Sequence, residues 1–169
     1  MLISVASLWV AVRASHTQEK LLSASVWPFL QYETSDFPSR TNDIRFTLQN
    51  AGVGPARLEW VTLYYRGKAY ATAREALRVC CGATRSSPAA TEYLQGRVLT
   101  ANQTVDFIRL PKDASDLAVW TRLDRQRLNF YLRSCYCSVL DECWLYDVRY
   151  KHHEPVKDCP PAEQPIYSG

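Results

Sequence analysis

The chain has 169 residues, of which 47% are hydrophobic and 22% charged, and its formal net charge at pH 7 is +3. This length suits one domain with its own core, and the composition excludes a wholly disordered chain. The 20 basic residues are scattered among 17 acidic ones, a balance that argues against nucleic acid as a partner. Five Trp and ten Tyr suit a β-sheet core.

The N-terminal segment opens with an uncharged apolar run, MLISVASLWVAV, which is followed by Arg13 and a polar stretch. As a helix this run of about 12 residues spans only about 18 Å, whereas a helix that crosses the bilayer core needs roughly 20 residues. Three interpretations fit it: the outer half of a membrane anchor, a signal-peptide core cleaved before Ser15, or a buried helix of a soluble protein. The anchor is favoured, because neither Pro nor Gly interrupts a helix over residues 3–24 and Trp9 suits a membrane interface.

The chain after this helix has mainly β patterns. Apolar and polar residues alternate over 44–49 and over 128–133, as they do in strands with one buried face. One short helix is expected over 71–82 with Gly82 as its terminating residue, and residues 111–126 fit a short helix or a loop. Strands are expected in the stretches VWPFLQY, DIRFTLQN, RLEWVTLYY, QGRVLTANQTVDFIRL (two strands around Ala101-Asn102), LNFYLRSCYC and, as the last strand, CWLYDVRY.

This pattern predicts a mainly β fold, an antiparallel Ig-like β-sandwich preceded by an N-terminal α-helix, with a small barrel as the alternative. We divide the chain into a membrane-anchor and stalk helix (1-25), a β-sandwich domain (26-150) and a proline-rich, loosely held C-terminal tail (151-169). The predicted core consists of Ile44, Phe46, Leu48, Leu58, Trp60 or Val61, Leu63, Phe107, Leu128, Phe130 and Leu132.

Six cysteines form an even set, Cys80, Cys81, Cys135, Cys137, Cys143 and Cys159. They would pair in an oxidising compartment, and in a reducing cytosol they would more often be metal ligands or reactive thiols. Cys137 and Cys143 flank five residues that suit a hairpin loop, which predicts a disulfide between them. Adjacent cysteines rarely bond to each other, so one or both of Cys80 and Cys81 are expected to be tied to the Cys135 strand or the Cys159 tail. Six cysteines allow fifteen pairings, and the sequence does not choose among them.

No metal, cofactor or catalytic site is predicted. Zinc sites use Cys-x2–4-Cys pairs and thioredoxin-like proteins use C-x-x-C, and the C-x-C-x5-C spacing here is neither. His152 and His153 are neighbours on an extended segment and point in opposite directions, so a shared metal site with Glu154 and Asp158 is not expected.

Two further motifs have simple structural interpretations. The stretch NAGVGPA, residues 50–56, connects two strands and lacks a following Lys-Ser/Thr, so it is interpreted as a turn in which Gly52 and Gly54 allow positive φ. Asp141 and Glu142 are expected at the solvated tip of the hairpin.

Several of these motifs, taken together, suggest a resemblance to a known group of proteins. The N-terminal helix, Trp27-Pro28, the turn from Asn50 to Ala56 and the hairpin from Tyr136 to Trp144 resemble small, uncharacterised, membrane-anchored periplasmic proteins of Gram-negative bacteria. The resemblance implies an exported domain, and it brings no activity, cofactor or catalytic residue.

The function that follows from these observations is a membrane-tethered extracytoplasmic β-sandwich module, a non-enzymatic binding or scaffolding protein of the cell envelope. It would be held at the inner membrane by its N-terminal helix, with the globular domain in the periplasm and a protein partner that the sequence does not name. The alternative is a thiol-redox or metal-dependent accessory protein that uses Cys135, Cys137 and Cys143. A count of free thiols in the unreduced protein separates the two.

Overall fold

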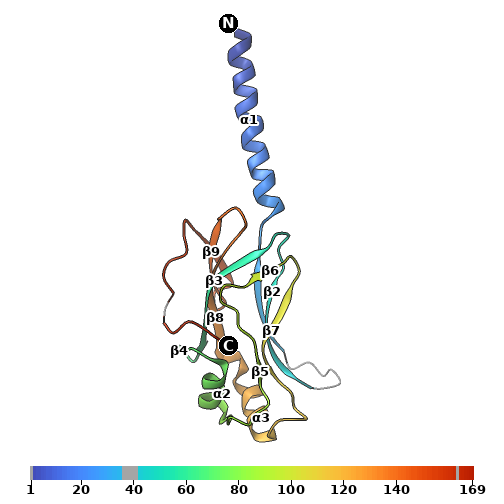
Figure 1. The fold of residues 1–169 in the computed structure, drawn as a ribbon, viewed down its shortest axis with the longest axis vertical. Coiled ribbons are helices and arrows are strands. Elements are labelled where there is room, and N and C mark those ends of the chain that lie inside the picture. The colour runs from blue at the N-terminus through green and yellow to red at the C-terminus, as the bar shows by residue number, and fades with distance from the viewer. Residues whose placement is uncertain (1, 36–41, 163) are drawn as a thin grey trace.

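The computed structural model describes residues 2–35, 42–162 and 164–169 of the chain. Within these residues the fold is mainly β, with an N-terminal helix followed by two antiparallel sheets (Figure 1). The helices are α1 (Leu2–Ser25), α2 (Ala73–Cys81) and α3 (Leu117–Gln126), with the 3-10 helix η1 (Arg127–Asn129) after α3. The strands are β1 (Leu30–Ser35), β2 (Ile44–Asn50), β3 (Ala56–Tyr65), β4 (Lys68–Tyr70), β5 (Ala90–Thr91), β6 (Val98–Leu99), β7 (Thr104–Leu110), β8 (Phe130–Cys137), β9 (Cys143–Asp147) and β10 (His152–Val156).

The two sheets lie over one shared core. The first sheet has the strand order β1-β2-β7-β5, and the second has β10-β9-β8-β3-β4, with β6 paired to β3 as well. Phe46 of β2 and Phe130 of β8 meet between the sheets, with ring centroids 5.2 Å apart. The alternation in β2 is complete, because every second residue from Ile44 onward is buried, as expected for a strand with one buried face.

The predicted core is buried with one exception. Leu128 is 80% exposed, because it lies in η1 rather than in a strand. Strand alternation therefore begins only at Phe130, where the backbone becomes extended. The other predicted core residues, from β2, β3, β7 and β8, are buried.

Of two strand predictions, one is confirmed and one is wrong. The sequence indicates two strands around Ala101-Asn102, and both exist, but β6 pairs with β3 whereas β7 pairs with β2 and β5. The expectation that β9 is the last strand is wrong, because β10 follows it and pairs with it antiparallel from His152 opposite Asp147 to Val156 opposite Cys143.

The short helices have ordinary sequence signals at their ends. The Thr72 side chain accepts a hydrogen bond from the backbone N–H of Glu75 at the start of α2. Gly82 ends α2 in the left-handed conformation, with φ of 74°, as predicted. The helix interpretation is also the correct one for the segment that forms α3. Both helices lie at the end of the sandwich opposite α1 (Figure 1).

Close backbone packing positions the connection between α1 and β1. The buried Asn50 side chain accepts hydrogen bonds from the backbone N–H groups of Phe29 and Gly52, and it donates one to the Leu99 carbonyl. Gly52 and Gly54 are not among the glycines with positive φ, so the predicted reason for them is wrong. A Cβ atom on either would collide with the backbone at residues 26–29, and this close approach is what requires glycine.

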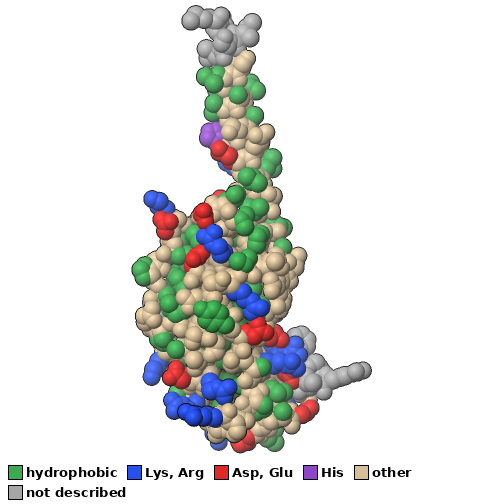
Figure 2. All heavy atoms as spheres, in the orientation of Figure 1, with side chains coloured by type: hydrophobic (Ala, Val, Ile, Leu, Met, Phe, Trp, Pro, Cys, Tyr) green, Lys and Arg blue, Asp and Glu red, His purple; other side chains and the backbone are tan. Residues whose placement is uncertain are grey.

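Helix α1 confirms the predicted helix over residues 3–24 and projects from the sandwich along the long axis of the molecule (Figure 1). Its apolar residues Leu8, Trp9 and Val10 are 66%, 61% and 59% exposed, and hydrophobic side chains are visible along its surface (Figure 2). Among the residues described, no helix combines the length and the apolar character needed to cross a membrane.

The C-terminal tail is not loosely held, contrary to the sequence prediction. Tyr167 is fully buried, its ring packs edge-on against Phe107 at 5.8 Å, and its hydroxyl donates to the Phe107 carbonyl. Its backbone N–H donates to the Val61 carbonyl of β3. The Trp60 indole N–H donates to the Pro160 carbonyl at 2.8 Å. Beyond β10 the described part of the tail forms no strand, and single side chains and carbonyls fix it to both sheets.

Candidate functional site

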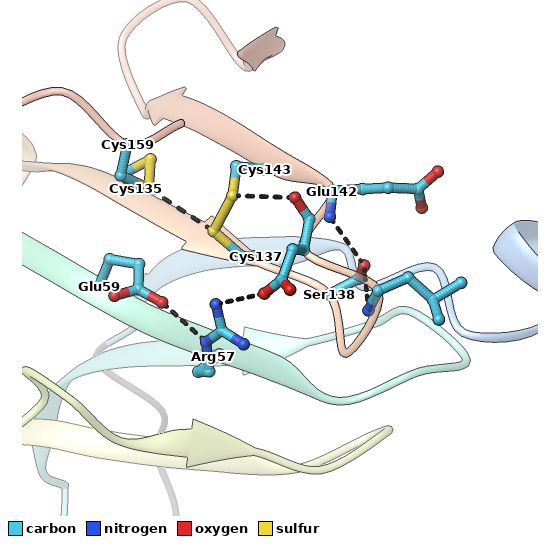
Figure 3. A network of polar contacts seen from close by, with 10 residues as sticks. Arg57, Glu59, Cys135, Cys137, Ser138, Glu142, Cys143 and Cys159 are labelled. Carbon is cyan, nitrogen blue, oxygen red and sulfur yellow. Dashed lines mark hydrogen bonds and ion pairs between the residues drawn. A yellow bond between two sulfur atoms is a disulfide. The ribbon is translucent and has the colours of Figure 1, made fainter. Parts of the chain in front are cut away.

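Four of the six cysteines meet where β8, β9 and the C-terminal tail come together (Figure 3). Cys137 and Cys143 form the predicted disulfide across the β8–β9 hairpin, with Cα atoms 4.0 Å apart. Cys135 is bonded to Cys159 of the tail, with Cα atoms 5.8 Å apart. Because successive side chains of a strand point to opposite faces and Tyr136 belongs to the core, Cys135 and Cys137 face away from the core.

The two disulfides touch each other. Cys137 Sγ lies 3.7 Å from Cys159 Sγ, and the sulfurs of Cys137, Cys143 and Cys159 all lie within 4.8 Å of one another. Cysteine binds metals as the thiolate, and these sulfurs are bonded in pairs. In its oxidised form the cluster therefore offers thiol–disulfide chemistry rather than metal ligands. We call these four residues the four-sulfur cluster.

The four-sulfur cluster is enclosed from several sides. Cys135, Cys137 and Cys143 are buried, although the outer face of a two-sheet fold normally meets water. Trp60, opposite Cys135 on β3, and the tail that its indole binds cover this part of the sheet. Cys159 is partly exposed, so solvent reaches the cluster from the tail side.

The hairpin loop between Cys137 and Cys143 is ordered by its own hydrogen bonds. The Ser138 hydroxyl accepts from the backbone N–H groups of Leu140 and Glu142, at 3.1 and 3.3 Å. The Ser138 N–H donates to the Glu142 carbonyl at 2.8 Å. Asp141 takes the left-handed conformation, with φ of 59°, which Asp tolerates better than most residues. The loop therefore presents the two acidic side chains in defined positions.

Asp141 is exposed at the hairpin tip, as the sequence predicts, but both acidic side chains also have partners. The Asp141 carboxylate pairs with the Arg57 guanidinium at 2.9 Å, and Arg57 also binds Glu59 at 2.8 Å (Figure 3). The hydrogen bonds to Glu59 and Asp141 raise the pKa of Arg57. The Glu142 carboxylate accepts a hydrogen bond from the Ser23 hydroxyl at 2.7 Å. The hairpin loop thus contacts the last turns of α1.

A pocket of about 230 Å³ lies beside the four-sulfur cluster on the same sheet. Trp60 connects the two, since it lines the pocket and pairs with Cys135 in register. On the pocket wall Arg133 meets Asp147 at 3.3 Å. Burial alone would raise the pKa of Asp147, but hydrogen bonds from Arg149 and the nearby guanidinium of Arg133 hold it below its ordinary value. The lining residues are Trp60, Arg133, Ser134, Leu145, Tyr146, Asp147, Tyr150, His152 and Glu154.

The two histidines do not form a shared site. His152 is exposed on the pocket rim, whereas His153 packs inward. The His153 ring lies between Phe29, at 4.2 Å, and Tyr146, at 4.3 Å, and its Nδ1 is 2.8 Å from the Tyr136 hydroxyl. Burial, assisted by the charge of His152, lowers the pKa of His153 to about 4. His153 is therefore neutral at physiological pH and acts as an aromatic packing residue.

Cys80 and Cys81 are bonded to each other at the end of α2, so the expected link to the Cys135 strand or the Cys159 tail is wrong. The reason is their position, because α2 lies at the end of the sandwich opposite the β8–β9 hairpin (Figure 1). Cys135 and Cys159 are in any case already joined. The α2 disulfide does not contribute to the candidate site.

Comparison with known proteins does not add a function: the chain matches no protein-family model, no curated protein and no solved structure.

The pocket beside the cluster was missed by sequence reasoning, although a signal for it exists. Pairing Cys137 with Cys143 fixes the hairpin register, and extending that register by four residues places Arg133 opposite Asp147. The contribution of Trp60 depends on β3 lying beside β8, a long-range pairing that no local pattern encodes.

Proposed function

We propose that this protein is a membrane-tethered, extracytoplasmic β-sandwich module that binds another protein and has no enzymatic activity of its own. The observation that carries the proposal is the state of the cysteines. All six lie within the described residues, and each is paired in a disulfide. Disulfides persist in oxidising compartments and are rare in the cytosol, so this pairing supports an exported domain.

We also propose that the sandwich is Ig-like. In an Ig domain, strands A, B, E and D form one sheet and strands G, F and C form the other. The order β1-β2-β7-β5 corresponds to A-B-E-D, and the order β9-β8-β3 corresponds to G-F-C. Folds of this type commonly serve as binding modules, with the contact surface on a sheet face or on the loops, and this analogy supports the proposal at the level of the fold.

The proposed tether is α1, which holds the module at the inner membrane with the sandwich in the periplasm. Leu8, Trp9 and Val10 are exposed on the part of α1 that lies far from the sandwich. An apolar helical surface with Trp suits the interfacial region of a bilayer. The hydrogen bond between Ser23 and Glu142 and the close packing around Asn50 fix the direction in which α1 leaves the domain.

The proposed contact surface is the pocket on the second sheet. Its volume of about 230 Å³ is below the 300–1,000 Å³ typical of small-molecule sites, and it suits a side chain of a protein partner. Trp, Tyr and Arg dominate the energetics of protein interfaces. Trp60, Arg133 and Tyr150 line the pocket, and Tyr150 is among the most exposed aromatic residues described.

Site-specific photo-crosslinking in cells tests the contact surface. A photoreactive amino acid at position 150 should give a cross-linked protein band that also appears from position 152. The matched control is position 93, because Tyr93 is another exposed tyrosine outside the pocket. Equal cross-linking from positions 93 and 150, or none from position 150, would contradict the proposed surface.

Cell fractionation tests the tether. Replacing Trp9 with Asp should move the protein from the membrane fraction to the soluble fraction, because a charge in the interfacial region opposes binding. The control is Gln18→Asp, which adds the same charge to an exposed polar position of the same helix. A wild-type protein that is already soluble, or that a protease reaches only after the inner membrane is broken, would contradict the proposed location.

A further inference from the structure

The contact between the two disulfides of the four-sulfur cluster suggests a stoichiometric redox reaction of the protein's own cysteines, which is separate from binding. Disulfides exchange when a thiolate attacks a disulfide sulfur. Cys137 Sγ and Cys159 Sγ belong to different disulfides and lie 3.7 Å apart, within the range in which heavy atoms touch. We propose that the four cysteines form a thiol–disulfide exchange site. An external thiol reduces one disulfide, and a sulfur released from it then attacks the other disulfide.

The first step opens the tail disulfide, because Cys159 is the partly exposed member of the cluster. A thiolate from a small thiol or a protein dithiol attacks Cys159 Sγ. A bond forms between that sulfur and Cys159, the Cys135–Cys159 bond breaks, and Cys135 leaves as a thiolate that takes a proton from solvent. A second external thiol then resolves the mixed disulfide, which releases the external disulfide and leaves Cys159 as a thiolate.

The second step transfers the opening to the hairpin. The Cys159 thiolate attacks Cys137 Sγ, which lies 3.7 Å away, a Cys137–Cys159 bond forms, and the Cys137–Cys143 bond breaks. Cys143 leaves as a thiolate and takes a proton from solvent. Across both steps two external thiols are oxidised to one disulfide, and one of the two protein disulfides is reduced. The product holds a Cys137–Cys159 bond, with Cys135 and Cys143 as thiols.

The structure holds the two reacting sulfurs in place from both sides. Cys137 lies at the end of β8 and pairs in register with Arg57 of β3. Cys159 precedes Pro160, whose carbonyl accepts the hydrogen bond from Trp60. The Sγ–Sγ contact therefore joins two anchored segments, and it does not depend on a freely moving tail. The exchange rests on the contact between Cys137 Sγ and Cys159 Sγ and not on the pocket or on α1, so its failure leaves the proposed binding function untouched.

The decisive variant is Cys143→Ser, which leaves Cys137 as a permanent free thiol beside the intact Cys135–Cys159 bond. The folded, unreduced variant is quenched in acid, alkylated and mapped by mass spectrometry. We expect both the Cys135–Cys159 and the Cys137–Cys159 linkages, in amounts within about tenfold of each other, which corresponds to about 1.4 kcal/mol. A Cys137–Cys159 linkage below about one hundredth of the other would overturn the proposal.

The control variant, Cys137→Ser with Cys143→Ser, removes the attacking sulfur and should show the Cys135–Cys159 linkage alone. Circular dichroism and the unfolding midpoint establish that both variants are folded. If Cys143→Ser does not fold, the wild-type protein is reduced partially with glutathione and mapped in the same way. The proposal expects the Cys137–Cys159 linkage with labels on Cys135 and Cys143. Labels confined to the two partners of one original disulfide would overturn it.

Discussion

The two ends of the sandwich carry the same chemical group in different settings. At the end near α1, disulfides join residues that are 6 and 24 positions apart in sequence and tie β8 to β9 and to the tail. At the opposite end, the α2 disulfide joins two neighbours, Cys80 and Cys81. The first end is cross-linked between segments, whereas the second is held by helix caps and by packing between α2 and α3.

This difference shows that the contribution of a disulfide to stability depends on how far apart its two cysteines lie in the sequence. A cross-link stabilises mainly by restricting the unfolded chain, and this effect grows with the number of residues it encloses. A bond between neighbours encloses almost nothing, so it leaves the unfolded chain nearly unchanged. The stability of the hairpin end should therefore depend on its disulfides, and that of the α2 end should not. Four measurements test this comparison.

The largest effect is expected in the core between the two sheets. Phe130→Ala removes a buried ring that contacts Phe46 and Tyr65, and it should lower the free energy of unfolding by about 3–5 kcal/mol. Chemical denaturation with the disulfides intact measures it and sets the scale for both ends. Leu128→Ala is the control, because Leu128 is exposed and should change stability by less than about 0.5 kcal/mol. Equal losses at both positions would mean that the core is placed wrongly.

The next effect is the loss of the longer cross-link at the hairpin end. Replacing Cys135 and Cys159 together with Ala leaves no free thiol in the pair, and it should cost about 3.5 kcal/mol for a separation of 24 residues. The same change at Cys137 and Cys143, which are 6 positions apart, should cost about 2 kcal/mol. Urea denaturation of both variants gives the two values. A larger loss from the shorter loop would show that chain restriction is not the main contribution.

A smaller effect concerns pH and again belongs to the hairpin end. The pKa of His153 is about 4 in the folded protein, against 6.5 ordinarily, because the ring is buried. Between these values the unfolded chain binds the proton more strongly, so stability falls as the pH falls from 6.5 towards 4. Because His153 is only half-buried, we expect a loss of about 1 kcal/mol between pH 7 and 5. Unfolding of wild type and His153→Phe at both pH values measures it, and the same slope in both would refute the assignment.

The smallest effect is expected at the α2 end. Replacing Cys80 and Cys81 together with Ala should change the free energy of unfolding by less than about 0.5 kcal/mol, since no loop of chain is released. Cys81 is buried and Cys80 partly exposed. Alanine is small and apolar and has the highest helix propensity, so it suits both positions of α2. Thermal unfolding of this variant beside the Cys135 and Cys159 variant gives the comparison directly. A loss as large as that of the hairpin-end variant would remove the distinction between the ends.

Local patterns predicted much of the fold. Alternation located β2 and β8, the helical pattern ending at Gly82 located α2, and an uninterrupted run located α1. The mainly β class, the antiparallel sheets and the N-terminal helix follow from such signals. The spacing of Cys137 and Cys143 also predicted their bond, because the two partners belong to one hairpin and a local turn brings them together.

Features that depend on distant segments were not predictable in this way. The partner of Cys135 lies in a tail without a regular pattern, and the burial of Tyr167 depends on contacts with β3 and β7. The sequence predicted Gly52 and Gly54 as turn glycines, whereas in the structure they leave room for the backbone between α1 and β1 to pack closely against them. In each case the physical cause is a contact between segments that are distant in the sequence, so the residue type alone gives an ambiguous signal.

The position of Tyr167 has a consequence for the biogenesis of the protein. Its ring completes the core against Phe107 and its backbone pairs with β3, yet it follows all the described strands in the sequence. A nascent chain, which emerges from its N-terminus, can assemble both sheets while the site for this tyrosine is still empty. Until then, apolar surface beside Val61 and Phe107 is open to water and to chaperones. Completion of the native core therefore waits until Tyr167 has reached the compartment in which the domain folds.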